Sequence, residues 1–140
     1  MAIPYLACMA LVASIYHLPP RVLPSIQHVE GGLPGTVRTN ANGSQDMGVM
    51  QVNTIWLPVL AAYTGLAENT VRERLTQRPC FNIAAAGLVF RTYLDEAHGD
   101  VMLAIGDYHS HTPVHNLNYQ SLVRKAADRL FFSFGHRTDR

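Results

Sequence analysis

The sequence has little charge and almost no lysine. Only 15% of its 140 residues are charged, 11 Lys and Arg stand against 10 Asp and Glu, and Lys125 is the single lysine. A nucleic-acid-binding surface usually needs a basic surplus on one face, and a polybasic tract needs clustered Lys or Arg. We therefore expect no nucleic-acid partner. Hydrophobic residues reach 48%, enough for one folded domain over residues 1–140.

The chain also lacks an apolar run long enough to cross a membrane. The apolar residues 2–16 end at His17, short of the roughly 20 residues that a spanning helix needs. No Lys or Arg precedes them, so a secretory signal peptide is not evident. We interpret this segment as the first buried helix of the domain and expect no membrane span.

Cysteine is scarce too, which excludes a metal centre built from cysteines alone. Cys8 and Cys80 stand far apart and form neither a C-x-x-C motif nor a ligand cluster. They are either two buried thiols or one disulfide, and the count alone leaves both readings open.

What remains is a mostly helical pattern with one polar hairpin. Gly31-Gly32 stops a helix that opens at Pro19-Pro20, and Asn42-Gly43 marks a hairpin turn within residues 36–49. Further helices are expected at 52–63, 70–77 (opened by a capping box at Thr70), 81–98, 100–108 (capped by Asp100) and 117–132, before a tail at about 135–140. This order predicts an α+β fold in which the hairpin walls a cleft for a polar ligand.

Glu30 is the first candidate for chemistry. It lies in the last turn of its helix, where the helix dipole and nearby apolar side chains both disfavour a carboxylate. Both effects raise the pKa toward the range useful to a general acid. The plainer alternative is a solvated Glu at a helix end.

A second candidate is the block Asp46-Met47-Gly48-Val49-Met50-Gln51-Val52-Asn53. Gly48 lets backbone approach a ligand closely, and Gln51 and Asn53 carry amides that donate to and accept from sugar hydroxyl and acetamido groups. Asp46 adds a second carboxylate after the hairpin. The alternative is a capped helix start with Met50 and Val52 packed inward.

A Glu that closes a helix, a polar hairpin and the D-x-G-V-M-Q-V-N block, in that order, resemble the lysozyme-like superfamily. More specifically, they resemble the lytic transglycosylase (SLT) domain in the small form that accompanies bacterial secretion and conjugation machines. Arg78-Pro79-Cys80-Phe81-Asn82-Ile83 is similar to the family's segment opening the long helix, and Gly106-Asp107-Tyr108-His109 falls at its Ala-Tyr-Asn motif. The resemblance spans about residues 8–124.

The resemblance implies a lysozyme-like α+β fold, predominantly helical, and cleavage of peptidoglycan glycan strands in the periplasm without a cofactor. Glu30 matches the single catalytic acid/base, and Tyr108 matches the tyrosine that approaches the reacting sugar. The residues that match the strip along the sugar cleft are Gly48, Met50, Gln51 and Asn53. The resemblance also implies a Cys8–Cys80 disulfide, and partners in an envelope-spanning secretion or conjugation apparatus.

The chain departs from the family at three positions. Gly31 stands where Ser is usual, His109 replaces the Asn of the motif, and Asp107 takes a position that is normally small. These departures keep an inactive glycan-binding module open as an alternative.

Two further alternatives concern the chemistry. Asp46 occupies the place of the second carboxylate of animal-type lysozymes, so a muramidase that hydrolyses with Glu30 and Asp46 is the nearest competing function. The spacing His109-x-His111-x3-His115 suits zinc or copper, although histidines in a loop beside a cleft are more often polar lining. We expect no metal.

Overall fold

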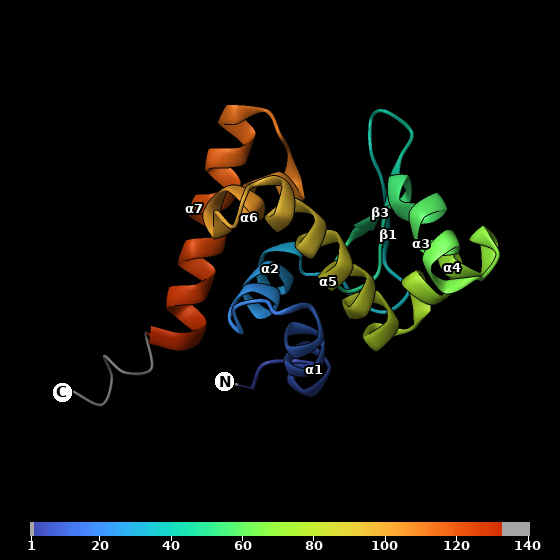
Figure 1. Cartoon of the computed structure of the whole chain (residues 1–140), viewed down its shortest axis with the longest axis horizontal. Helices are drawn as coiled ribbons and strands as arrows, with labels where there is room; N and C mark the ends of the chain where they lie inside the picture. The colour runs from blue at the N-terminus through green and yellow to red at the C-terminus, as the bar shows by residue number, and fades with distance from the viewer. Residues whose placement is uncertain (1, 133–140) are drawn as a thin grey trace.

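In the computed structural model, which describes residues 2–132, the long helix α5 (Pro79–Glu96) crosses the middle of the molecule (Figure 1). Helices α1 (Leu6–Tyr16), α2 (Val22–Glu30), α6 (Val101–His109) and α7 (Pro113–Ala127) lie toward one side of it. The small sheet and helices α3 (Leu57–Thr64) and α4 (Glu68–Gln77) lie toward the other. The fold is mostly helical α+β, as expected.

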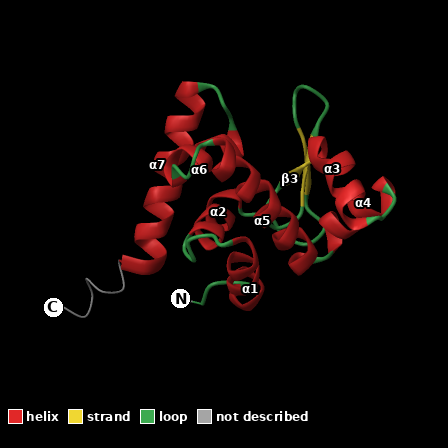
Figure 2. Cartoon of the chain, in the orientation of Figure 1, coloured by secondary structure: helices red, strands yellow, loops and turns green. Residues whose placement is uncertain are grey.

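The sheet is antiparallel, with the strand order β1 (Val37–Thr39), β2 (Gln45–Met47), β3 (Val52–Asn53). Figure 2 shows its strands in yellow beside α3. The hairpin around Asn42-Gly43 is confirmed, with Arg38 paired to Asp46 across β1 and β2. On its other side, Asp46 pairs with Asn53 of β3. The register therefore places Asp46 between Arg38 and Asn53 in the short sheet.

The prediction of a helix over 52–63 is wrong at its N-terminal end. Val52 and Asn53 pair with β2, and the Asn53 side chain then accepts a hydrogen bond from the Ile55 amide to cap a 3-10 turn (Thr54–Trp56). The α-helix begins only at Leu57. An N-cap has a non-helical backbone, so Asn53 can be both the last residue of β3 and the N-cap of the helical turn that follows.

Other helix boundaries differ by a few residues. The capping box at Thr70 is wrong, because α4 begins at Glu68 after Ala67, whose side chain makes no cap. By contrast, Asp100 caps α6 as predicted by accepting from the Leu103 amide. Helix α2 begins at Val22, and α7 begins at Pro113 and gives way to a π-helical segment (Asp128–Phe132). The tail expected at 135–140 lies outside the described residues.

The core lies between α5 and the elements around it. Its largest fully buried side chains include Phe90, Met9, Leu23, Ile26, Met47, Met50, Leu75 and Ile83. Only one face of α1 is buried: Met9, Val12 and Ala13 face inward, while Leu11 and Ile15 are exposed. Among the described residues, none of the helices combines the length and the apolar character needed to cross a bilayer.

A disulfide joins Cys8 of α1 to Cys80 in the first turn of α5, with 5.6 Å between their Cα atoms. The bond closes a loop of 72 positions that contains α2, the sheet, α3 and α4. The predicted pairing is therefore confirmed. It fixes α1 against α5, where the two helices pack together.

Candidate functional site

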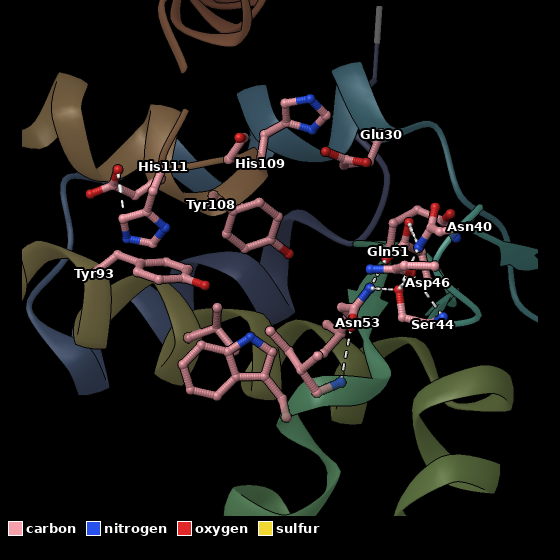
Figure 3. A pocket seen from close by; sticks show the side chains of 17 residues that line it. Glu30, Asn40, Ser44, Asp46, Gln51, Asn53, Tyr93, Tyr108, His109 and His111 are labelled. Atoms are coloured by element: carbon pink, nitrogen blue, oxygen red, sulfur yellow. Dashed lines mark hydrogen bonds and ion pairs between the residues drawn. The ribbon is translucent and has the colours of Figure 1, made fainter. Parts of the chain in front are cut away.

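A cavity of about 370 Å³ lies between the sheet, α5 and α6 (Figure 3). Glu30 and His109 lie along one edge, Asp46, Asn40 and Asn53 lie at the sheet end, and Tyr93 and His111 lie at the opposite end. Its remaining lining residues are Asn42, Ser44, Gln51, Val52, Ile55, Trp56, Val89, Asp107, Tyr108 and Ser110. The structure therefore gathers five of the predicted site residues on one polar cavity: Glu30, Asp46, Gln51, Asn53 and Tyr108.

Glu30 ends α2 at the wall of this cavity. The pKa of Glu30 is raised to about 7: burial raises it most, a hydrogen bond from the Tyr119 hydroxyl lowers it, and the Asp46 carboxylate raises it further. Gly31 follows in the left-handed conformation, with φ of 63°, and donates its amide to the Gln27 carbonyl. A glycine at this position therefore ends the helix directly after Glu30 without backbone strain.

Asp46 is fixed by the side chains around it. Its two carboxylate oxygens accept hydrogen bonds from Asn53 Nδ2 at 2.8 Å and Asn40 Nδ2 at 3.2 Å. Ser44 Oγ accepts from both amides at 3.1 Å. This network holds the Asp46 carboxylate in one orientation at the sheet end of the cavity.

Gln51 combines an unusual backbone with an unsatisfied side chain. Its φ is 54°, and its Nε2 donates to the Gly48 carbonyl at 2.9 Å. Within residues 2–132, its side-chain carbonyl oxygen is buried and has no hydrogen-bond partner. A buried acceptor without a donor lowers the stability of the folded state. The side-chain oxygen of Gln51 is therefore a candidate to accept a hydrogen bond from a bound ligand.

Gly48 and Met50 do not line the cavity. They lie packed in the turn that carries Gln51, which does line it. A Cβ on Gly48 would lie 2.2 Å from the Leu75 carbonyl oxygen and 2.4 Å from Asn82 Nδ2. The Met50 side chain is fully buried. Its carbonyl oxygen accepts the Tyr108 hydroxyl at 2.9 Å, which holds the tyrosine at the cavity wall.

Asn82 organises the turn that carries these residues. It is fully buried, accepts from the Met50 amide and donates to the carbonyls of Met47 and Leu75, each at 2.8 Å. One side chain on α5 thus satisfies backbone groups from two other segments. These bonds set the position of Gln51 relative to α5.

Two contacts of Tyr119, one of them with Glu30, were not predicted from the sequence. Tyr119 of α7 donates to the Glu30 carboxylate, and the His109 ring stacks on the Tyr119 ring with centroids 4.8 Å apart and 10° between the planes. A second cavity of about 220 Å³ opens on the far side of Glu30 and His109, lined also by Tyr119, His115 and Leu122. The sequence pattern does not single out Tyr119.

The three histidines of the H-x-H-x3-H pattern do not share one ligand set. His109 stacks on Tyr119, His115 lines the second cavity, and His111 Nε2 lies 2.6 Å from Glu96 Oε1. Helix α6 ends at His109, and the loop after it turns His111 toward α5.

This site can exchange a proton near neutral pH and bind a polar ligand. Glu30 supplies the proton, the Asp46 network supplies a fixed negative charge, and Gln51 supplies a free acceptor. Aromatic rings at the other end, Trp56 and Tyr93, meet edge to face with centroids 5.7 Å apart. A comparison of the sequence with protein-family models and with curated proteins finds no match.

Proposed function

We propose that this chain is a peptidoglycan lytic transglycosylase that cleaves the β-1,4 bond between N-acetylmuramic acid and N-acetylglucosamine. The observation that carries the proposal is the partly buried Glu30, whose pKa of about 7 lets one carboxyl group act as both acid and base beside a polar cavity. The sequence resemblance to the lytic transglycosylase domain supplies the substrate class.

In the proposed reaction, protonated Glu30 donates its proton to the bridging oxygen as the glycosidic bond breaks. The ionised Glu30 then takes the proton of the muramoyl C6 hydroxyl, whose oxygen attacks C1 and closes a 1,6-anhydro ring. No water is consumed, so the anhydro product is one water lighter than the product of hydrolysis. Glu30 ends the cycle protonated again.

Three groups of side chains around Glu30 suit this cycle. The Tyr119 hydroxyl donates to Glu30 and stabilises the ionised form that the second step requires. Asp46 lies near enough to raise the pKa of Glu30, and its negative charge favours the positive charge that develops at C1. Gln51 and Asn53 offer amide groups to the acetamido or hydroxyl groups of the sugars.

The proposed setting is the periplasm, where limited cutting of the wall opens a passage for a secretion or conjugation apparatus. This part of the proposal rests on the sequence resemblance. The disulfide between Cys8 and Cys80 supports it, because such bonds persist mainly in oxidising compartments.

Hydrolysis is a second candidate, favoured by the geometry of Asp46. Two side-chain amides and the sheet register hold this carboxylate on the same cavity as Glu30. A fixed second carboxylate is what a retaining muramidase uses to stabilise or attack the sugar C1. In that reaction a water molecule, not the C6 hydroxyl, attacks C1 of the sugar in the final step.

The test is mass spectrometry of the soluble products released from purified peptidoglycan. Products with a 1,6-anhydro end, absent with Glu30→Gln and present with the exposed control Glu73→Gln, are the expected result. Products with a reducing end and the full mass would replace the transglycosylase with a muramidase. Retained binding to peptidoglycan with no release would identify a glycan-binding module.

Asp46→Asn separates the two reactions further. The substitution keeps an oxygen that accepts from Asn53 but removes the charge. A transglycosylase that depends on Glu30 alone should lose about tenfold or less in rate. A two-carboxylate hydrolase should lose roughly a thousandfold or more, in line with the loss of one member of a catalytic pair.

A further inference from the structure

Three potential metal ligands meet at the end of the cavity away from Asp46. Glu96 comes from α5, Asp107 from α6, and His111 from the loop that follows α6. Their ligand atoms all lie within 4.8 Å of one another. His111 Nε2 is 2.6 Å from Glu96 Oε1 and 3.8 Å from Asp107 Oδ1. Figure 3 shows His111 in place, with its ring nitrogen directed toward a neighbouring carboxylate.

Asp107 is a buried carboxylate aimed into this group. Its side chain is only 6% exposed, whereas those of His111 and Glu96 are 58% and 52% exposed. The other groups whose charge acts on Asp107 are His111, Glu96 and Asp100, and of these only His111 can be positive. Two facing carboxylates beside one imidazole leave an excess of negative charge that a divalent cation would offset.

A second set of residues holds the ligands in place. Asn116 of α7 is buried, and its Nδ2 donates to Asp107 Oδ1 at 2.9 Å and to the Ser110 carbonyl at 3.1 Å. Its Oδ1 accepts from Gln120 Nε2 at 2.6 Å. One amide thus fixes a ligand carboxylate and also the loop that carries His111. Outer hydrogen bonds of this kind are what orient the ligands in built metal sites.

The absence of a side chain at Gly106 leaves room for the Asn116 amide. A Cβ on Gly106 would lie 1.9 Å from Asn116 Oδ1, so any other residue there would displace Asn116. On the cavity side, the Tyr93 ring meets the His111 ring edge to face, with centroids 5.4 Å apart. The imidazole is therefore held by Tyr93 on one side and by the Asn116-anchored loop on the other.

We propose that Glu96, Asp107 and His111 bind a divalent transition-metal ion of the zinc type. One imidazole nitrogen and two carboxylate oxygens form a mixed donor set that suits this ion, with a fourth position left for water or an exogenous oxygen. Bond lengths of about 2.1 Å at tetrahedral angles place the ligand atoms about 3.4 Å apart. Small side-chain rotations of Glu96 and His111, both exposed, reach that spacing. Because Asp107 and His111 line the cavity, the fourth position faces it.

The test uses Zn²⁺ in isothermal titration calorimetry and Co²⁺ as a spectroscopic probe of the full chain. We expect one ion per chain, a Kd in the micromolar range, and visible absorption bands from four-coordinate Co²⁺ displaced by Zn²⁺. Asp107→Asn and His111→Gln should each weaken binding at least tenfold. His28→Gln, which removes an exposed histidine of α2, should leave binding unchanged.

The variants themselves are expected to fold. Asn at 107 still accepts from Asn116, and residue 111 is exposed, so thermal unfolding should change by only a few degrees. No binding below 1 mM Zn²⁺ would overturn the proposal and leave only the hydrogen-bonded contact between His111 and Glu96. Equal binding by the native chain and His111→Gln would overturn it as well. Neither result depends on whether the chain cleaves glycan.

Discussion

The hydroxyl of Tyr119 in α7 donates a hydrogen bond to the carboxylate of Glu30 at the end of α2, across 89 positions of sequence. The contact exists because α2 and α7 pack against each other and the His109 ring covers the Tyr119 ring. Burial raises the pKa of Glu30, and this hydrogen bond opposes the rise. Tyr119 therefore increases the fraction of Glu30 that is ionised at neutral pH.

Removing that hydroxyl with Tyr119→Phe should raise the pKa of Glu30 further. A hydrogen bond to a charged group contributes about 1.5–3 kcal/mol, which corresponds to a rise of about one unit or more. A ¹³C-carboxyl titration followed by NMR measures this directly and needs no activity. Tyr63→Phe, at an exposed tyrosine of α3, is the control and should leave the titration as it was. A midpoint unchanged by Tyr119→Phe would contradict this role.

Glu30→Gln should stabilise the protein at alkaline pH. Below about pH 4.5 Glu30 is protonated in both the folded and the unfolded chain, so its burial gives no pH dependence there. Between pH 4.5 and 7 the unfolded chain loses the proton while the folded chain keeps it, and the folded state loses up to about 3 kcal/mol of stability. The side-chain amide of Gln does not titrate, so the Glu30→Gln variant does not lose this stability.

Urea unfolding at pH 4, 6 and 8 measures the effect. The difference in free energy of unfolding between Glu30→Gln and the native chain should grow in favour of the variant from pH 4 to pH 8. Glu73→Gln, at an exposed residue of α4, should show no such trend. A difference that is constant over this pH range would mean that Glu30 titrates normally in the folded chain.

Gly48→Ala should be far more damaging than Gly43→Ala. Both glycines have positive φ, 72° and 87°, so both substitutions carry the strain of a left-handed backbone, about 1 kcal/mol. The added methyl at 43 meets nothing within 4 Å, but at 48 it meets the Leu75 carbonyl and the Asn82 amide. We expect a further loss of at least about 2 kcal/mol at 48. Equal chemical-denaturation midpoints would refute the close packing there.

Breaking the disulfide should destabilise the fold without unfolding the site directly. A closed loop of 72 positions corresponds to about 4 kcal/mol in the chain-entropy model. Cys8→Ser with Cys80→Ser should therefore lower the free energy of unfolding by about that amount. The same loss should appear when the native chain is reduced. If the reduced and oxidised chains unfold at the same denaturant concentration, the loop is already constrained in the unfolded chain.

The helices and the position of Glu30 were predictable because they depend on local signals. Gly31 marks the end of α2, and Asp100 caps α6 through its own side chain. The raised pKa of Glu30 was predicted in direction from its place in the last turn. Strand β3 was not, because two residues make no periodic pattern and their pairing is set by β2.

The contacts that tune the site depend on packing between distant segments. Nothing near Tyr119 in the sequence indicates Glu30 as its partner, since the pairing follows from how α2 and α7 meet. The histidine pattern gave no indication of the contact between His111 and Glu96 for the same reason. The end of α6 directs the following loop toward Glu96 of α5, which the spacing of histidines does not reveal.

The three hydrogen bonds of Asn82 carry a consequence for how the cavity floor opens. They join α5 to the β2–β3 turn and to α4, so the turn acquires its native geometry only when all three segments have come together. The Met50 amide should then exchange with deuterium only through global unfolding, whereas exposed amides of the 40–44 hairpin tip exchange by local opening. The floor of the cavity should therefore open only when the whole domain unfolds, although much of it is turn rather than helix.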